Sequence, residues 1–116
     1  MGRTYSRTEY HIVFGTARRT PSVSREVRAA LYRFMAEVVI SRGGRVHGIG
    51  GTDDHVHLDV EIPVAQKVSD MVAAIKATSS GWMRRRAGIP TFRWQRGYAA
   101  FSVSPSFRGR LLTYID

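Results

Sequence analysis

The chain has 116 residues, of which 43% are hydrophobic and 23% are charged, and this is the size and composition of one folded domain. It contains no cysteine, which excludes disulfide bonds and thiolate metal sites. No apolar run is long enough to cross a bilayer and no signal peptide opens the chain, so we expect a cytoplasmic protein without a membrane partner.

The charge of the chain is strongly basic. Lysine and arginine together number 18 against 9 aspartate and glutamate residues, which gives a formal net charge of +9. Only Lys67 and Lys76 are lysines, and arginine binds phosphate bidentately and stacks on bases, so a nucleic-acid partner is favoured. The alternative is compositional, since a GC-rich genome also replaces lysine with arginine.

The first half of the chain predicts a strand, a helix and a second strand. Residues 10–14 are aromatic and β-branched, which is typical of a strand. A helix follows with apolar residues at helical spacing; Ser22 or Ser24 caps its start, and Gly43-Gly44 ends it. Residues 45–51 indicate a second strand, which their glycines weaken.

A third strand is predicted over residues 55–62, after a turn at residues 52–54. Its residues alternate between apolar and polar types, so the two faces of the strand differ. The apolar face consists of Val56, Leu58, Val60 and Ile62, and the polar face consists of His55, His57, Asp59 and Glu61. Pro63 ends this strand.

The rest of the chain predicts a helix at 68–86, an aromatic loop at 92–97, a strand at 98–104 and a short final helix that begins near Pro105. The order strand, helix, strand, strand, helix, strand is the split βαβ plan. We therefore predict one α+β domain over residues 1–116, with a ferredoxin-like (RRM-like) antiparallel sheet and two helices on one of its faces.

His55 and His57 are two residues apart on the third predicted strand and therefore point the same way, about 7 Å apart. Two imidazoles in this arrangement can converge on one metal ion. A His-x-His pattern is weak by itself, and the alternative is a pair of exposed or hydrogen-bonded histidines on a polar sheet face.

Asp59 and Glu61 extend the histidine face with two carboxylates. Oxygen ligands suit Mg²⁺ and Mn²⁺, and imidazole is also a ligand of Mn²⁺. The alternative is a solvated outer face whose carboxylates pair with nearby arginines.

Tyrosine is the candidate nucleophile. The chain has no cysteine, no Gly-x-Ser-x-Gly elbow and no glycine-rich phosphate loop. A phenol has a pKa of about 10 and needs activation. A metal that draws charge from a phosphate would activate it as an electrophile, and attack by tyrosine would leave a covalent phosphotyrosine.

Four segments of the chain carry a resemblance to a known family. They are Tyr10-His11-Ile12-Val13-Phe14, GGTDDHVHL at residues 50–58, Trp94-Gln95-x-Gly97-Tyr98-x-Ala100-Phe101-Ser102-Val103-Ser104, and Thr113-Tyr114-Ile115. In this order they resemble the single-tyrosine HUH transposases, which move small insertion sequences as single-stranded DNA. The group includes the transposases associated with repetitive extragenic palindromes (REPs).

The resemblance implies roles for individual residues. His55 and His57 match the metal-binding histidines, Tyr114 on the last helix matches the nucleophile, and Tyr98 matches a structural position. The implied protein uses Mg²⁺ or Mn²⁺ to cut single-stranded DNA with hairpin ends, leaving a 5′-phosphotyrosine and a free 3′-hydroxyl. Family members are homodimers whose sheets join, and the tyrosine helix of one subunit can complete the site of the other.

The chain departs from the family pattern at two places. Members usually continue past the tyrosine to a polar residue that completes the metal site; here that position would follow Asp116, so we expect a truncated C-terminal helix. Members usually have apolar residues where Asp59 and Glu61 stand, which makes Asp59 a candidate third metal ligand. The alternative is a degenerate relative that binds DNA hairpins without cleavage. An unrelated metal hydrolase is supported by the histidine pair alone.

Basic residues near the expected site are candidates for contacts with DNA. The candidates for phosphate are Arg18, Arg19, Arg93 and Arg96. Trp94 is a candidate for stacking on a base, with local packing as the alternative. For His11 and His47 we expect hydrogen-bonded sheet histidines rather than metal ligands.

Overall fold

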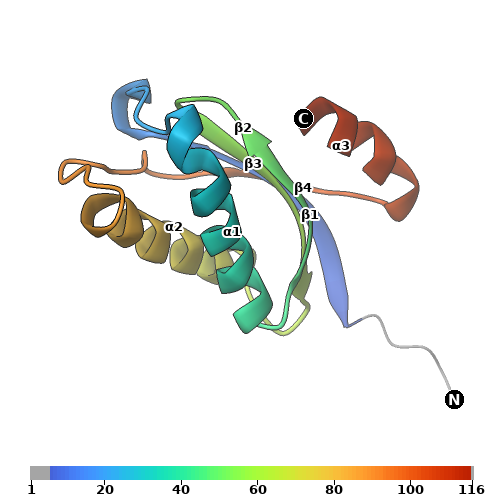
Figure 1. Ribbon diagram of the computed structural model, residues 1–116. Coiled ribbons are helices and arrows are strands. Elements are labelled where there is room, and N and C mark those ends of the chain that lie inside the picture. Colours follow the sequence, from blue (N-terminus) through green and yellow to red (C-terminus); the bar gives the residue numbers. More distant parts are fainter. Residues whose placement is uncertain (1–5, 116) are drawn as a thin grey trace, which may run out of the picture.

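The computed structural model describes residues 6–115 and consists of one sheet and three helices, joined in part by two 3₁₀ turns (Figure 1). The elements are β1 (Arg7–Gly15), a 3₁₀ turn (Ala17–Arg19), α1 (Arg25–Ser41), β2 (Arg45–Gly51), β3 (His55–Pro63), α2 (Val68–Arg85), β4 (Ala99–Ser102), a 3₁₀ turn (Pro105–Phe107) and α3 (Arg108–Ile115). The sheet is antiparallel with strand order β2-β3-β1-β4. The predicted α+β plan is confirmed.

Helices α1 and α2 cover one face of the sheet, and the core lies between them and the strands (Figure 1). The alternation of β3 places its four apolar residues in this core, where each is at most 1% exposed. None of the helices in the described part of the chain is both long and apolar enough to cross a membrane.

Helix α3 lies on the opposite face of the sheet, against β2 and β3 (Figure 1). The glycines of β2 make this close approach possible. A Cβ atom at Gly48 would lie 2.6 Å from Cδ2 of Leu112, and one at Gly50 would lie 2.6 Å from the backbone oxygen of Ile115. The glycines that weaken the strand prediction are therefore the positions on which α3 rests.

The structure differs from the prediction at the ends of some elements. Strand β4 is shorter than residues 98–104 because it pairs only with β1, and Pro105 has no N–H with which to extend the pairing. Ser24 occupies the N-cap position of α1, but its side chain makes no capping hydrogen bond. The last helix begins at Arg108, after the second 3₁₀ turn, and Asp116, the position of the expected truncation, lies outside the described residues.

The contact between Gly50 and α3 predicts the effect of a single methyl group. In a Gly50→Ala variant the added Cβ would clash with the backbone oxygen of Ile115. Backbone cannot move aside as the end of a flexible side chain can. We expect amide exchange to show loss of protection over residues 108–115 while the central strands stay protected. A Gly109→Ala control adds its methyl group where no described atom lies within 4 Å, so it should leave α3 protected.

Candidate active site

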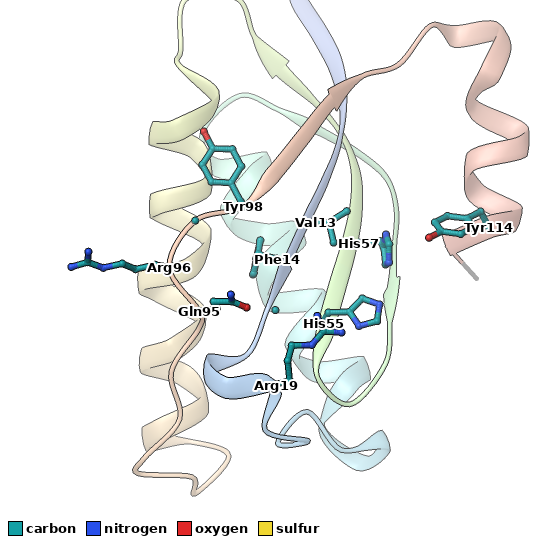
Figure 2. A pocket seen from close by; sticks show the side chains of 11 residues that line it. Val13, Phe14, Arg19, His55, His57, Gln95, Arg96, Tyr98 and Tyr114 are labelled. Atoms are coloured by element: carbon teal, nitrogen blue, oxygen red, sulfur yellow. The ribbon is translucent and has the colours of Figure 1, made fainter.

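His55 and His57 lie on the face of β3 that α1 and α2 leave uncovered, and Tyr114 of α3 lies on the same side (Figure 2). His11 of the neighbouring strand β1 joins them on this face. The imidazole centroids of His55 and His57 are 5.0 Å apart, with the rings inclined at 71°. The strand alternation therefore brings the two predicted metal ligands side by side.

The loop before β3 orients His55. Its Nδ1 lies 2.9 Å from Oδ1 of Asp54 and 2.9 Å from Oγ1 of Thr52. The hydrogen bond with His55, with help from Arg19, lowers the pKa of Asp54 to about 2, so this carboxylate is ionised and can only accept. When Nδ1–H of His55 donates to it, Nε2 keeps its lone pair for a metal ion.

His57 is 9% exposed, and its Nδ1 lies 2.8 Å from Nε2 of His11. Burial, together with the charges of protonated His11 and His55, lowers the pKa of His57 to about 4. Burial also lowers the pKa of His11. Both rings are therefore neutral near pH 7, and neutral imidazole is the form that binds metal ions.

The place of His11 in this site was not predicted from the sequence. His11 is hydrogen-bonded, as expected, but its partner is a proposed metal ligand. The signal that could have found it is strand register: in the β1–β3 pair, His11 lies opposite Asp59, one strand repeat from His57 and on the same face. That register cannot be read from local periodicity. His47 is hydrogen-bonded, as expected, with Nε2 2.6 Å from Oε2 of Glu61.

Tyr114 reaches the histidines from α3. Its ring meets the ring of His57 edge-on, with centroids 5.4 Å apart, and lies 6.3 Å from His11. The side chain is 70% exposed although it is large and aromatic. A phenol beside two imidazoles and open to solvent can be reached by a bound phosphodiester.

An open cavity of about 430 Å³ connects this site with the loop before β4. His55, His57 and Tyr114 lie on one side of it, and Arg96 and Tyr98 lie on the other, near α2 and β4 (Figure 2). Tyr98 and Tyr114 thus line the same cavity, but the aromatic contact with His57 belongs to Tyr114.

Two of the four predicted phosphate contacts, Arg19 and Arg96, line the active-site cavity. Arg18 and Arg93 line a neighbouring cavity of about 510 Å³. Arg18 and Arg19 have φ angles of 57° and 55°, a left-handed conformation that is uncommon outside glycine. This strained turn places Nη2 of Arg19 3.3 Å from the Asp54 carboxylate.

Trp94 belongs to the packing of the loop before β4. Its ring stands edge-on to the rings of Phe14 and Phe92, and its Nε1–H donates to Ser79 at 2.9 Å. These contacts agree with the local-packing alternative, while stacking of Trp94 on a base stays a prediction. The same loop is held by Nζ of Lys76, which donates to the backbone oxygens of Gln95 and Gly97.

Beyond the histidines the same face carries the carboxylate cluster, which we define as Glu9, Asp59 and Glu61. Ligand atoms of Glu9, His47 and Glu61 lie within 4.8 Å of one another, a spacing that could hold a metal ion. Arg108 of α3 already lies among them: Nη2 is 2.8 Å from Oε1 of Glu9, Nε is 3.0 Å from Oε2 of Glu9, and Nη2 is 3.8 Å from Glu61.

The guanidinium of Arg108 therefore supplies the positive charge of the carboxylate cluster. Burial raises the pKa of Glu9, but the hydrogen bonds and charge of Arg108 outweigh it and keep that pKa below its usual value. We interpret this cluster as the attachment of α3 to the sheet rather than as a cation site.

Asp59 lies in the carboxylate cluster. Its side chain is 0% exposed, and within the described chain neither oxygen has a hydrogen-bond donor. Burial and the neighbouring Glu9 carboxyl raise the pKa of Asp59 to about 7. Within residues 6–115 it does not form a three-ligand group with His55 and His57, so its role as third metal ligand stays a prediction.

The fold and the site define an α+β protein with a histidine pair on the sheet face opposite α1 and α2 and a tyrosine on the helix that packs against that face. The sequence model of the IS200-like transposases matches residues 4–116, and the chain belongs to this family. The resemblance seen in the four sequence segments is thereby confirmed, and with it a general role in DNA processing as a transposase.

Two solved structures share the fold. A protein described as a transposase from Deinococcus radiodurans R1 is 24% identical, with a TM-score of 0.76 over 99% of this chain and 94% of that one. A REP-associated tyrosine transposase bound to a REP hairpin is 14% identical, with a TM-score of 0.72 over 99% of this chain and 69% of that one. No curated protein sequence matches the chain significantly.

The raised pKa of Asp59 predicts a pH-dependent effect of Asp59→Asn. Between about pH 4 and pH 7 the folded chain holds a proton on Asp59 that the unfolded chain releases, so this carboxyl lowers the stability of the wild type as the pH rises. Asparagine carries no such proton. Urea unfolding in metal-free buffer should show the variant gaining stability relative to the wild type from pH 4 to pH 7. A difference that is constant over this range would contradict the assignment.

Proposed function

We propose that this chain is a metal-dependent single-stranded DNA transposase, which cleaves and rejoins DNA through a 5′-phosphotyrosine on Tyr114. One observation carries the proposal: the ring of Tyr114 stands 5.4 Å from that of His57, which in turn stands 5.0 Å from that of His55. The nucleophile and the two metal ligands implied by the family resemblance are thus adjacent within one chain.

The residues of the site fit a divalent metal, Mg²⁺ or Mn²⁺. Hydrogen bonds at Nδ1 hold His55 and His57, and Nε2 is the other nitrogen through which each ring would bind the metal. Once bound, the metal would polarise the scissile phosphate and offset the charge that develops on it. Two imidazoles leave coordination positions for phosphate oxygens, for water or for Asp59.

The proposed cleavage uses Tyr114 as the nucleophile. The phenolic oxygen forms a bond to phosphorus, the bond from phosphorus to O3′ breaks, and the phenolic proton is balanced by the proton that the released 3′-hydroxyl gains. The reverse reaction with another 3′-hydroxyl rejoins the strand and frees the tyrosine. The 70% exposure of Tyr114 supports this role, because the strand needs access to it.

Arginines around the site are the proposed contacts with the DNA backbone. Arg19 and Arg96 would bind phosphates near the cleaved bond, and Arg18 and Arg93 would bind the strand further away. The neighbour bound to a REP hairpin supports hairpin ends as the substrate. The family resemblance further supports a homodimer. A degenerate relative that binds hairpins without cutting them is the second candidate.

The proposal predicts a covalent adduct between the chain and DNA. The full chain, mixed with a labelled single strand that carries a hairpin and with Mn²⁺, should give a denaturation-resistant adduct that Tyr114→Phe abolishes. Tyr98→Phe, a matched change in the same cavity, should keep the adduct because Tyr98 does not contact His57. An adduct that survives Tyr114→Phe would contradict the assignment, and hairpin binding without any adduct would favour the binding module.

A second prediction concerns phosphate contacts. Arg96→Ala should weaken hairpin binding, and the slope of log affinity against log salt should decrease by about one, because one phosphate contact is lost. The matched control is Arg33→Ala, which removes the same charge from the exposed side of α1, across the sheet from the site. Equal salt slopes for the two variants would place the DNA elsewhere.

A further inference from the structure

We infer that His11 is a positioning residue: it accepts the hydrogen bond of His57 Nδ1–H and so fixes the tautomer in which Nε2 of His57 can bind a metal ion. The inference rests on the proposed function, because it assigns a role at the same site. It adds a residue of β1 to the pair on β3.

The contact between the two rings is short and well defined. Nε2 of His11 lies 2.8 Å from Nδ1 of His57, which is a hydrogen-bond distance, and the two rings lie edge to edge, with centroids 5.1 Å apart and planes inclined at only 17°. Between two imidazole nitrogens at this distance there is room for one proton. Either His57 donates it to His11, or His11 donates it to His57.

Only one of these arrangements permits metal binding. If His11 donates, neutral His57 must carry its own proton on Nε2, and no lone pair remains for a ligand bond. If His57 donates from Nδ1, Nε2 is free, and His11 carries its proton on Nδ1. Metal binding by His57 therefore requires His11 to act as the acceptor.

His55 shows the same arrangement with a different partner. Its Nδ1 lies 2.9 Å from the Asp54 carboxylate, which has no proton to donate and so leaves one tautomer. His57 has an imidazole in the place of this carboxylate. Both histidines are thus oriented through Nδ1 by a neighbour that is not itself a metal ligand, and losing such a partner typically weakens metal binding by about 10- to 100-fold.

Two substitutions of His11 distinguish the effect of its hydrogen-bond acceptor from the effect of its aromatic ring. His11→Phe keeps an aromatic ring against His57 and removes the acceptor, whereas the amide oxygen of His11→Gln can occupy the position of Nε2. By calorimetry on the full chain with Mn²⁺ alone, we expect affinity to fall by about 10- to 100-fold in His11→Phe and to be largely kept in His11→Gln. His47→Gln is the control, because His47 bonds to Glu61 and should leave Mn²⁺ affinity unchanged.

The tautomer can also be read without metal. Nitrogen-15 NMR of the metal-free wild-type chain should show the proton of His57 on Nδ1, and His11→Phe should move it toward Nε2. A wild-type proton on Nε2, or wild-type Mn²⁺ affinity in His11→Phe, would overturn the inference. Failure of the wild type to bind Mn²⁺ would count against the proposed function, while the wild-type spectrum, which needs no variant, would still decide the role of His11.

Discussion

The bidentate ion pair between Arg108 and Glu9 connects α3, the helix that carries Tyr114, to the sheet, and the geometry of the site depends on it. Helix α3 has eight residues, too few to be stable without packing partners. The side chain of Glu9 is 4% exposed, so its charge requires a close partner, and Arg108 supplies two hydrogen-bonding nitrogens. Together with the close approach at Gly50, this ion pair fixes where Tyr114 stands relative to His57.

The polar face of strand β3 carries two groups of residues with different surroundings. Its first half presents His55 and His57 to the cavity, and its second half presents Asp59 and Glu61 to the residues that attach α3. Because side chains on one face repeat about every 7 Å, the two groups are adjacent without sharing ligands. The carboxylates at positions 59 and 61, where family members usually have apolar residues, therefore belong to the region that attaches α3 to the sheet. Among the described residues, Asp59 itself has no hydrogen-bond donor.

The sequence predicted those features that depend on local periodicity. The alternation of β3 and the order of strands and helices were sufficient for the sheet, the core face and the proximity of His55 to His57. Features that depend on contacts across the fold were not predictable in this way. The hydrogen bond between His11 and His57 joins residues 46 positions apart. The need for glycine at position 50 follows only from the close approach of α3. The orientation of Trp94 depends on its packing against Phe14.

We propose that the histidine pair, and not the group of Glu9, His47 and Glu61, holds the metal beside Tyr114. Anomalous diffraction from crystals of the Tyr114→Phe variant, grown with Mn²⁺ and a hairpin-bearing single strand, tests it most directly. We expect a manganese peak bonded to Nε2 of His55 and His57, with a DNA phosphate next to residue 114. A peak among Glu9, His47 and Glu61, with none at the histidine pair, would contradict it.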